Sequence, residues 1–396
     1  MDITIHPRLL QGDITVIPSK SQAHRLLICA AFADAPTVLH CPETNRDMDA
    51  TAGCLNALGA AIVKTETGYS VTPAQEIPDQ AELHVHDSGS TLRFMLPVAG
   101  ALGVDTVFHM EGRLPQRPLS PMWEEMERMG CSVSRPSPDS IRCTGKLRPG
   151  HYRIDGSVSS QYITGFLLAL SLLDSTSELE ITGHVESRPY IQMTKDAISL
   201  FGADPQNPGA RRFHSPGNLT VEGDWSNGAF FLAANALGSH LDVFGLKSDS
   251  SQGDRVCAEL LLTLREEMLV IDAGDIPDLV PILSVVAACC HGAEFLNIRR
   301  LRLKESDRVA SVIAMITALG GKAEADENTL RVFSTGLTGG TVDSVNDHRI
   351  AMSAAIAASA CKQPVTILGA DCVNKSYPRF FEEYRRLGGN YEQYLR

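Results

Sequence analysis

The sequence lacks any long hydrophobic run, and this absence argues against a membrane-spanning helix. Its longest apolar stretches, such as residues 279–290, are about a dozen residues long, whereas a membrane span needs roughly 18 or more. The first 16 residues are polar and alternating, and they lack the apolar segment of a signal peptide. We therefore expect a cytoplasmic protein that does not bind membranes.

The chain also lacks an excess of positive charge and the usual cofactor motifs. Its 35 Lys and Arg face 47 Asp and Glu, a net charge of −12, which argues against a nucleic-acid partner or an anionic membrane surface. No GxGxxG, GxxxxGKS or GxSxG pattern occurs, so we expect neither a nucleotide cofactor site nor a hydrolase elbow.

Grouped metal ligands and paired cysteines are missing as well. The ten cysteines form no CxxC pair, so buried free thiols of a reducing compartment fit better than a disulfide framework. His84 and His86 alternate along a probable strand, but no second His or Cys pair accompanies them, and we expect no metal site.

What the sequence does contain is a repeat. Amphipathic segments end repeatedly in a bulky apolar residue followed by Gly, the residue that favours the left-handed backbone just past a helix. These glycines recur about every 70 residues, except for one interval of 118, in which one copy has lost its Gly and residues 261–271 lie where that copy is expected. The glycines are Gly59, Gly130, Gly202, Gly320 and Gly388.

A second series of small, apolar segments runs in step with the first. Its segments begin near Lys20, Gly89, Ser159, Ser226, Asp278 and Asp347. Two signals with one period predict six α/β units, each with a buried helix, a strand, an amphipathic helix and further strands. A chain of 396 residues is too long for one core. We expect three units per domain, with domains at 15–223 and at 224–396 plus 1–14.

Cations and hydroxyls gather at the predicted helix starts and in neighbouring loops. Helix N-termini attract anions, and capping alone would not require Lys or Arg beside the cap. The set therefore predicts binding of phosphates or carboxylates. It comprises Lys20, Ser21, Arg25, Ser90, Arg93, Arg117, Ser159, Ser160, Gln161, Lys304, Arg308, His348, Arg349 and Lys375.

Two carboxylates stand among these cations. Asp278 begins an otherwise apolar helix, and Glu305 lies between Lys304 and Arg308. A carboxylate beside an anion site suggests a general base or acid. The alternatives are that Asp278 is a simple N-cap and that Glu305 forms a surface salt bridge.

The motifs SKSQAHR, SGSTLR, LPQRPLSP, DGSVSSQ, SRPYIQMT, IPDLVP, RLKESDR, DHRIAMS and NKSYPRF follow one another from Ser19 to Phe380. In this order they resemble the 5-enolpyruvylshikimate-3-phosphate (EPSP) synthase family. The resemblance implies a two-domain inside-out α/β barrel with three βαβαββ-type repeats per domain. It also implies transfer of the enolpyruvyl group of phosphoenolpyruvate to the 5-hydroxyl of shikimate 3-phosphate in chorismate biosynthesis, with release of phosphate.

The resemblance further implies roles for single residues. Asp278 would be the base for the 5-hydroxyl, and Glu305 and Lys20 are candidates for proton transfer at the methylene group. Phosphoenolpyruvate would be held by Lys20, Gly89, Arg117, Gln161, Arg308, Arg349 and Lys375. Shikimate 3-phosphate would be held by Lys20, Ser21, Arg25, Ser159, Ser160, Gln161, Ser187, Asp278 and Lys304. These residues divide between the two domains, so we expect a monomer that closes on its ligands.

Several positions depart from the commonest family pattern, among them Asp87, Phe94 and Arg300. They affect fine contacts to shikimate in our interpretation and leave the activity intact. Three alternatives stay open: an enolpyruvyl transferase acting on a UDP-amino sugar, a relative of RNA 3′-phosphate cyclase, and a non-catalytic anion-binding protein. Intact Lys20, Asp278 and Glu305 argue against the last, because binding alone would not require both carboxylates.

Overall fold

The computed structural model describes residues 1–209 and 213–394. The chain divides into two compact units, and it passes from one to the other twice. The N-terminal unit is Pro18–Glu222, and the C-terminal unit is Met1–Ile17 with Gly223–Arg396. Each unit has a hydrophobic core of its own.

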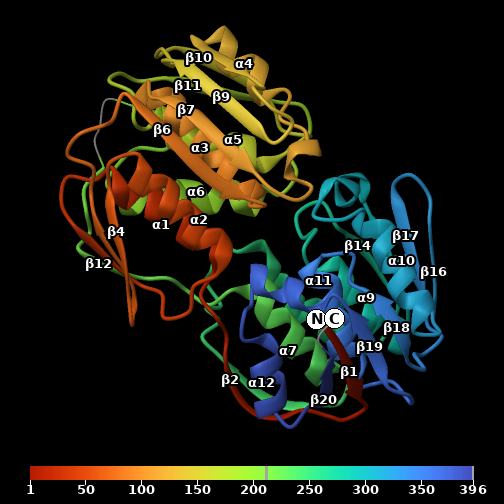
Figure 1. The fold of residues 1–396 in the computed structure, drawn as a ribbon. Helices are drawn as coiled ribbons and strands as arrows, with labels where there is room; N and C mark the ends of the chain where they lie inside the picture. The colour runs from red at the N-terminus through yellow and green to blue at the C-terminus, as the bar shows by residue number, and fades with distance from the viewer. Residues whose placement is uncertain (210–212, 395–396) are drawn as a thin grey trace. The chain divides into compact units, whose positions relative to one another are not determined.

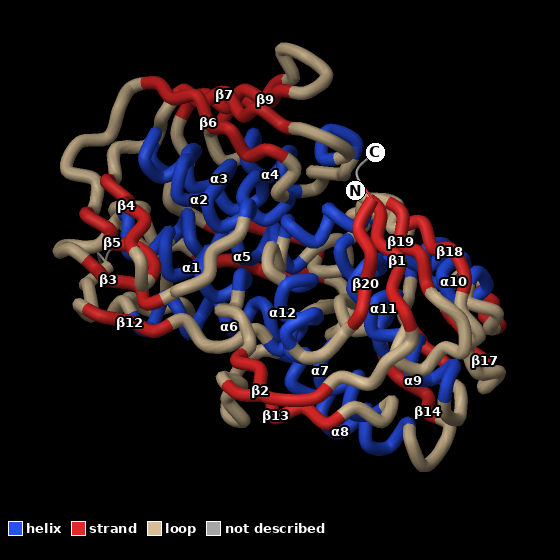
Figure 2. Tube along the Cα trace, turned by 60° about the horizontal axis from the view of Figure 1, so that its bottom comes forward, coloured by secondary structure: helices blue, strands red, loops and turns tan. Residues whose placement is uncertain are grey.

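Helices occupy the interior of each unit, and strands lie around them (Figures 1 and 2). The inner helices of the N-terminal unit are α1 (Lys20–Ala31), α3 (Gly89–Leu102) and α5 (Ser160–Leu170). Those of the C-terminal unit are α7 (Trp225–Ala236), α9 (Val280–Cys289) and α11 (His348–Ala357). They are rich in Ala, Leu and Val and are buried over most of their length. All six begin within two residues of the starts predicted from the sequence.

A second helix follows in each repeat. These helices are α2 (Arg46–Ala57), α4 (Met122–Arg128), α6 (Arg188–Leu200), α8 (Cys257–Leu264), α10 (Arg308–Ala318) and α12 (Phe380–Arg386). Short 3-10 turns precede four of them: η1 (Leu114–Gln116), η2 (Gly253–Val256), η3 (Arg299–Leu303) and η4 (Ala370–Lys375). All five glycines of the predicted series have a positive φ, between 73° and 117°, as expected past a helix end.

Within the described residues, each unit has two four-stranded sheets and one two-stranded sheet. In the N-terminal unit, one four-stranded sheet orders β12 (Asn218–Thr220), β3 (Thr37–His40), β5 (Gly68–Thr72) and β4 (Ala61–Thr65). The other orders β6 (Gln80–His86), β7 (Asp105–Met110), β9 (Ser140–Gly145) and β8 (Cys131–Ser134). The third sheet pairs β10 (His151–Asp155) with β11 (Glu178–Thr182).

The C-terminal unit repeats this plan. One sheet orders β14 (Leu269–Asp272), β15 (Ala293–Leu296), β17 (Thr329–Phe333) and β16 (Lys322–Ala325). Another orders β18 (Gly340–Asp343), β19 (Val365–Leu368), β1 (Asp2–His6) and β20 (Asn390–Tyr394). The two-stranded sheet pairs β13 (His240–Phe244) with β2 (Gln11–Thr15).

The four larger sheets share one topology, a parallel pair followed by two antiparallel pairings. In the sheet of β18, β19, β1 and β20, the N-terminal strand β1 occupies the position that β5, β9 and β17 occupy in the other three sheets. Two strands also pair outside their own stretch of sequence. β2 precedes α1 but pairs with β13, and β12 precedes α7 but pairs with β3.

The βαβαββ-type repeat is shortened in two places. In the described part of the chain, the third and fourth repeats lack the closing hairpin. After α8 the chain runs through residues 265–268 directly into β14, so residues 261–271 comprise the end of α8, this short link and most of β14. The strands form separate sheets around the helices, and no closed barrel is formed by the residues described.

Close helix packing sets the position of the first candidate residues. A Cβ added to Gly165 of α5 would lie 2.2 Å from the carbonyl oxygen of Arg93 in α3, so only glycine allows these helices to approach so closely. Gln161 lies one turn before Gly165 and is thereby placed against Arg93.

The cysteines carry free thiols, as predicted, and most of them are buried. Among the described residues, no helix combines the length and the apolar character that crossing a bilayer requires.

Candidate active-site residues

The start of α1 carries the first candidate residues. Ser19 caps the helix, and the Lys20 ammonium group lies 2.9 Å from a carboxylate oxygen of Asp47 at the start of α2. Both side chains are largely buried, with 16% and 5% exposed. One turn on, burial lowers the pKa of His24 to about 3, so this ring is neutral and adds no charge beside Lys20.

Arg25 lies one turn after Ser21 on α1 and is 2% exposed. Its guanidinium donates to the hydroxyls of Thr194 and Thr164 and to backbone oxygens of Ser21 and Tyr190. These acceptors are all uncharged, and no carboxylate of the described residues forms an ion pair with Arg25. Burial lowers the pKa of Arg25 to about 10. A buried cation without a counter-ion is costly and is expected where an anionic ligand supplies the missing charge.

Two more arginines lie over the N-terminus of α3. A Cβ added to Gly89 would lie 2.5 Å from Nη1 of Arg117 and 2.6 Å from Nη1 of Arg93. The helix start is thus covered closely by two guanidiniums, which a larger residue at position 89 would displace. The Nε of Arg117 is buried without a hydrogen-bond partner, and within the described chain Arg117 forms no ion pair. Helix dipole and guanidiniums together make this a strongly positive spot.

The start of α5 faces the same place. Gln161 accepts a hydrogen bond from Arg93 at 3.1 Å and donates to Ser90 of α3 at 2.9 Å. Ser159 caps α5, and Ser160 is buried. Ser187, at the start of α6, adopts a left-handed backbone with φ 55°, a strained state for a serine that is common at ligand sites.

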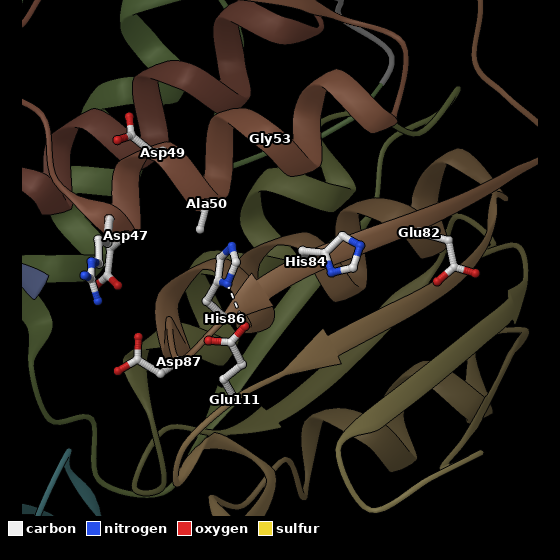
Figure 3. A pocket seen from close by; sticks show the side chains of 10 residues that line it. Asp47, Asp49, Ala50, Gly53, Glu82, His84, His86, Asp87 and Glu111 are labelled. Atoms are coloured by element: carbon white, nitrogen blue, oxygen red, sulfur yellow. Dashed lines mark hydrogen bonds and ion pairs between the residues drawn. The ribbon is translucent and has the colours of Figure 1, made fainter.

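An acidic pocket of about 480 Å³ lies beside these residues, between α2 and β6 (Figure 3). Asp47 and Asp87 point into one end of it, and His86 hydrogen-bonds Glu111 at 2.9 Å. Asp47 links the pocket to Lys20. Five carboxylates and one arginine, Arg46, line this pocket, so its lining is negative overall and repels the anions that Lys20, Arg25 and Arg117 attract.

In the C-terminal unit, Asp278 is held between two arginines. Its Oδ1 accepts from Arg308 at 2.7 Å and its Oδ2 from Arg349 at 3.0 Å, while the Lys304 ammonium lies 3.9 Å away. Leu279, and not Asp278, occupies the cap position of α9 and makes no side-chain cap bond. The N-cap alternative for Asp278 is therefore not supported.

Electrostatics hold Asp278 ionised. Burial by itself would raise the pKa of its carboxyl, but the nearby Arg349, Lys304 and Arg308 outweigh burial and keep the pKa well below its usual range. Burial lowers the pKa of Lys304 to about 8, and the negative charge of Asp278 opposes part of this shift.

Arg308 is the centre of this cluster and is 1% exposed. Besides Asp278, it donates to Glu305 at 2.8 Å and to Asp347 at 3.2 Å. Glu305 is 19% exposed and pairs with this buried cation, so it is not an ordinary surface salt bridge. Both candidate catalytic carboxylates, Asp278 and Glu305, are oriented by one guanidinium.

Several predicted residues contact one another within each unit: Arg93 contacts Gln161 in the N-terminal unit, and Arg308 and Arg349 contact Asp278 in the C-terminal unit. Arg349 is anchored by Ser226 at the start of α7, while Lys375 ends the η4 turn. Three polar residues were missed by the sequence reasoning: Asp47, Asp347 and Ser226. A usable signal existed for two of them, because Asp347 and Ser226 stand at helix starts of the repeat.

Comparison with known proteins finds matches over nearly the whole chain. Residues 5–384 match the family model described as EPSP synthase (3-phosphoshikimate 1-carboxyvinyltransferase). A 3-phosphoshikimate 1-carboxyvinyltransferase of Clostridium kluyveri is 36% identical, covering 99% of this chain and 98% of the relative. One of Clostridioides difficile is 34% identical, with the same two chains covered by 99% and 98%.

Solved structures share the fold at lower identity. The EPSP synthase of Acinetobacter baumannii superposes with a TM-score of 0.79 at 20% identity, covering 99% of this chain and all of the other. The enolpyruvyl transferase NikO of Streptomyces tendae gives a TM-score of 0.76 at 18% identity, covering 99% and 98%. With a family model and full-length relatives above 30% identity in agreement, the chain belongs to the EPSP synthase family.

Proposed function

We propose that this chain transfers the enolpyruvyl group of phosphoenolpyruvate to the 5-hydroxyl of shikimate 3-phosphate and releases inorganic phosphate. The observation that carries the proposal is the pair of guanidiniums of Arg25 and Arg117. Neither has a carboxylate partner among residues 1–209 and 213–394, although Arg25 is buried and Arg117 lies partly buried on a helix N-terminus. Both substrates carry a phosphate and a carboxylate, which would complete these charges.

The N-terminal unit supplies most of the anion contacts. Arg117, the backbone at Gly89 and Gln161 would hold phosphoenolpyruvate, because they converge on the start of α3. Arg25, together with hydroxyls at three helix starts, would hold shikimate 3-phosphate. These hydroxyls belong to Ser21, Ser159, Ser160 and Ser187, and Lys20 contacts both substrates in this assignment.

Most of the proton chemistry comes from the C-terminal unit, with Lys20 of the N-terminal unit as one candidate donor. Asp278 takes the proton of the 5-hydroxyl as its oxygen bonds to C2 of phosphoenolpyruvate, while Glu305 or Lys20 gives a proton to C3. The product of this addition is a tetrahedral ketal phosphate. The group that protonated C3, Glu305 or Lys20, then takes one proton back from the new methyl group, the enol double bond re-forms, and the C2–O bond to phosphate breaks. The proton that Asp278 took from the hydroxyl leaves with the phosphate. Atoms and charge balance, since phosphate departs with the electron pair of the broken bond.

The low pKa of Asp278 fits this role once ligands are bound. An efficient general base has a pKa near the working pH, and the ligand-free carboxyl lies well below that. Arg308, Arg349 and Lys375 are assigned to phosphoenolpyruvate and Lys304 to shikimate 3-phosphate. When the substrate anions share these cations, their pull on Asp278 weakens and its pKa rises toward the working range.

Both units are needed for this assignment, because neither contains the full residue set. We propose that the chain acts as a monomer in the cytoplasm and that ligands favour a closed form. Small-angle scattering should show a smaller radius of gyration with shikimate 3-phosphate, and an unchanged profile at saturating ligand counts against closure.

A phosphate-release assay tests the function. Phosphate should appear when both substrates are mixed with the protein, and not with either alone. Release with a UDP-amino sugar in place of shikimate 3-phosphate would favour the other enolpyruvyl transfer. Binding of both substrates without release would favour a non-catalytic relative.

A further inference from the structure

Asp347 is the most deeply buried charged residue of the C-terminal cluster, with no exposed surface. Its Oδ1 accepts the backbone N–H of Arg349 and thereby caps α11. Its Oδ2 accepts from the Ser306 hydroxyl at 3.0 Å and from Nε of Arg308 at 3.2 Å. One carboxylate therefore connects the start of α11 with the segment that carries Glu305 and Arg308.

The backbone that leads into Asp347 is strained. Val345 and Asn346 both have a positive φ, 47° and 59°, and a β-branched valine is rarely found in this conformation. Strain of this kind persists only where the surrounding structure holds it. Here it sets the direction in which the Asp347 side chain enters the cluster.

Three carboxylates bind Arg308, each at a different nitrogen of its guanidinium. Asp278 and Glu305 bind its two terminal nitrogens and are each 19% exposed, whereas Asp347 binds Nε from the fully buried side. Asp347 therefore cannot touch a ligand without a rearrangement of the cluster. Asp347 fixes the orientation of the planar Arg308 guanidinium, and this guanidinium in turn fixes the two partly exposed carboxylates, Asp278 and Glu305.

We infer that Asp347 is a positioning residue for the transfer reaction: it aims Arg308, and through it Asp278 and Glu305, at the reacting atoms. This inference rests on the proposed function, in which those two carboxylates move protons. A shift of about 1 Å in a reacting group costs up to about 10²-fold in rate.

Asp347 also sets the charge balance of the cluster. The charged groups around it are Arg308, Glu305 and Lys304 from the η3–α10 segment, Asp278 before α9, and Arg349 of α11, with His348 beside it in the chain. The Cys372 thiol of η4 faces it as well, and after burial the negative charges of Asp347 and Asp371 add to the raised pKa of that thiol. Removing the charge of Asp347 makes the cluster more positive, which lowers the pKa of Asp278 further.

The test is the Asp347→Asn variant, because asparagine caps a helix about as well as aspartate. It keeps one oxygen for α11 but loses either the Arg308 contact or the cap. We expect kcat to fall by about ten- to hundred-fold, with little change in the KM for shikimate 3-phosphate. The acid limb of the kcat profile should move to lower pH, which a simple cap would not cause.

Asp307→Asn is the matched control. Asp307 caps the neighbouring helix α10, but its side chain is 43% exposed and pairs weakly with Arg302 at 3.6 Å. This variant should keep the kcat and the pH profile of the unaltered protein. An equal loss in both variants would overturn the inference, since it would reflect helix capping in general.

A folded Asp347→Asn protein with unaltered kcat and an unmoved acid limb overturns the inference directly. If that variant does not fold by circular dichroism, Arg308→Lys replaces it, because a lysine cannot bind three carboxylates as a planar fork. Unaltered turnover in Arg308→Lys would likewise overturn the inference. An inactive unaltered protein would instead remove the proposed function, so the two failures are distinguishable.

Discussion

The two candidate clusters of this chain treat their cations in opposite ways. In the N-terminal unit, Arg25 and Arg117 meet only uncharged groups or have no hydrogen-bond partner among the described residues. In the C-terminal unit, Arg308 and Arg349 are both ion-paired, and Arg308 alone binds three carboxylates. In the first cluster, no carboxylate of the described residues balances the positive charges of Arg25 and Arg117. In the second cluster, carboxylates of the protein itself balance the charges of Arg308 and Arg349.

This difference separates binding from chemistry. An unbalanced buried cation gains most from an anionic ligand, because the ligand removes an existing cost. A balanced cluster gains less from a ligand, but it holds Asp278 ionised and orients both Asp278 and Glu305. We therefore assign affinity mainly to the N-terminal unit and proton transfer mainly to the C-terminal unit. The predictions below test this division.

The largest effect is expected for Asp278→Asn. The change keeps the shape of the side chain and removes its basicity, and general-base catalysis is worth roughly 10²–10⁴-fold. Turnover should fall by that order, while shikimate 3-phosphate still binds and the melting temperature changes little. A steady-state assay with a melting curve measures both. Near-normal turnover in a stable variant would remove Asp278 from the mechanism.

Arg117→Ala should act on affinity instead. Hydrogen bonds to charged groups contribute about 1.5–3 kcal/mol, so the KM for phosphoenolpyruvate should rise about ten-fold or more with the fold intact. Arg142→Ala is the matched control, because Arg142 is half exposed on β9 and pairs with Asp105. If the two variants show the same KM, the assignment of the Arg117 loop is wrong.

The repeat makes much of this division visible in the sequence. The helix starts and their capping residues recur with a regular spacing, so Lys20, Gly89, Asp278 and Arg349 can be singled out from the order of residues alone. The contacts between these residues and their partners cannot be read in this way, since Asp47 and Asp347 reach Lys20 and Arg308 from other helices, although Asp347 itself stands at a helix start of the repeat. Of the two missing hairpins, only that of the fourth repeat is visible in the sequence, as the short step from Ser226 to Asp278.

The balanced cluster also predicts a pH dependence through Lys304. Burial lowers the pKa of this lysine to about 8, so its ammonium group is charged below that pH and loses its charge as the pH rises through it. The kcat/KM for shikimate 3-phosphate should therefore fall about ten-fold per pH unit above about 8, because kcat/KM reports the free enzyme.

Lys304→Arg tests whether Lys304 causes this fall of kcat/KM at alkaline pH. Arginine stays charged over the whole range, so the alkaline fall should disappear in the variant, even if its contacts are less favourable. A fall that persists unchanged would assign the limb to another group, and Lys304 would then have no part in it.

The smallest effect on the KM for phosphoenolpyruvate is expected for Gly89→Ala, because this change displaces the guanidiniums of Arg117 and Arg93 without removing them. The added Cβ would overlap the ends of the Arg117 and Arg93 side chains. These flexible ends can move, so the cost in stability is small, and alanine favours the helix more than glycine does. The KM for phosphoenolpyruvate should rise by less than in Arg117→Ala, while the melting temperature stays level or increases.

Gly53→Ala is the matched control for this small effect on the KM. Gly53 lies inside α2, and a Cβ there would meet no atom within 4 Å. Replacing a helical glycine by alanine stabilises by roughly 0.5–1 kcal/mol, so both variants share the gain in helix propensity, and only Gly89→Ala should change the KM. Equal KM values in the two variants would mean that the guanidiniums over α3 do not bind phosphoenolpyruvate, and the N-terminal unit would lose its role as the anion site.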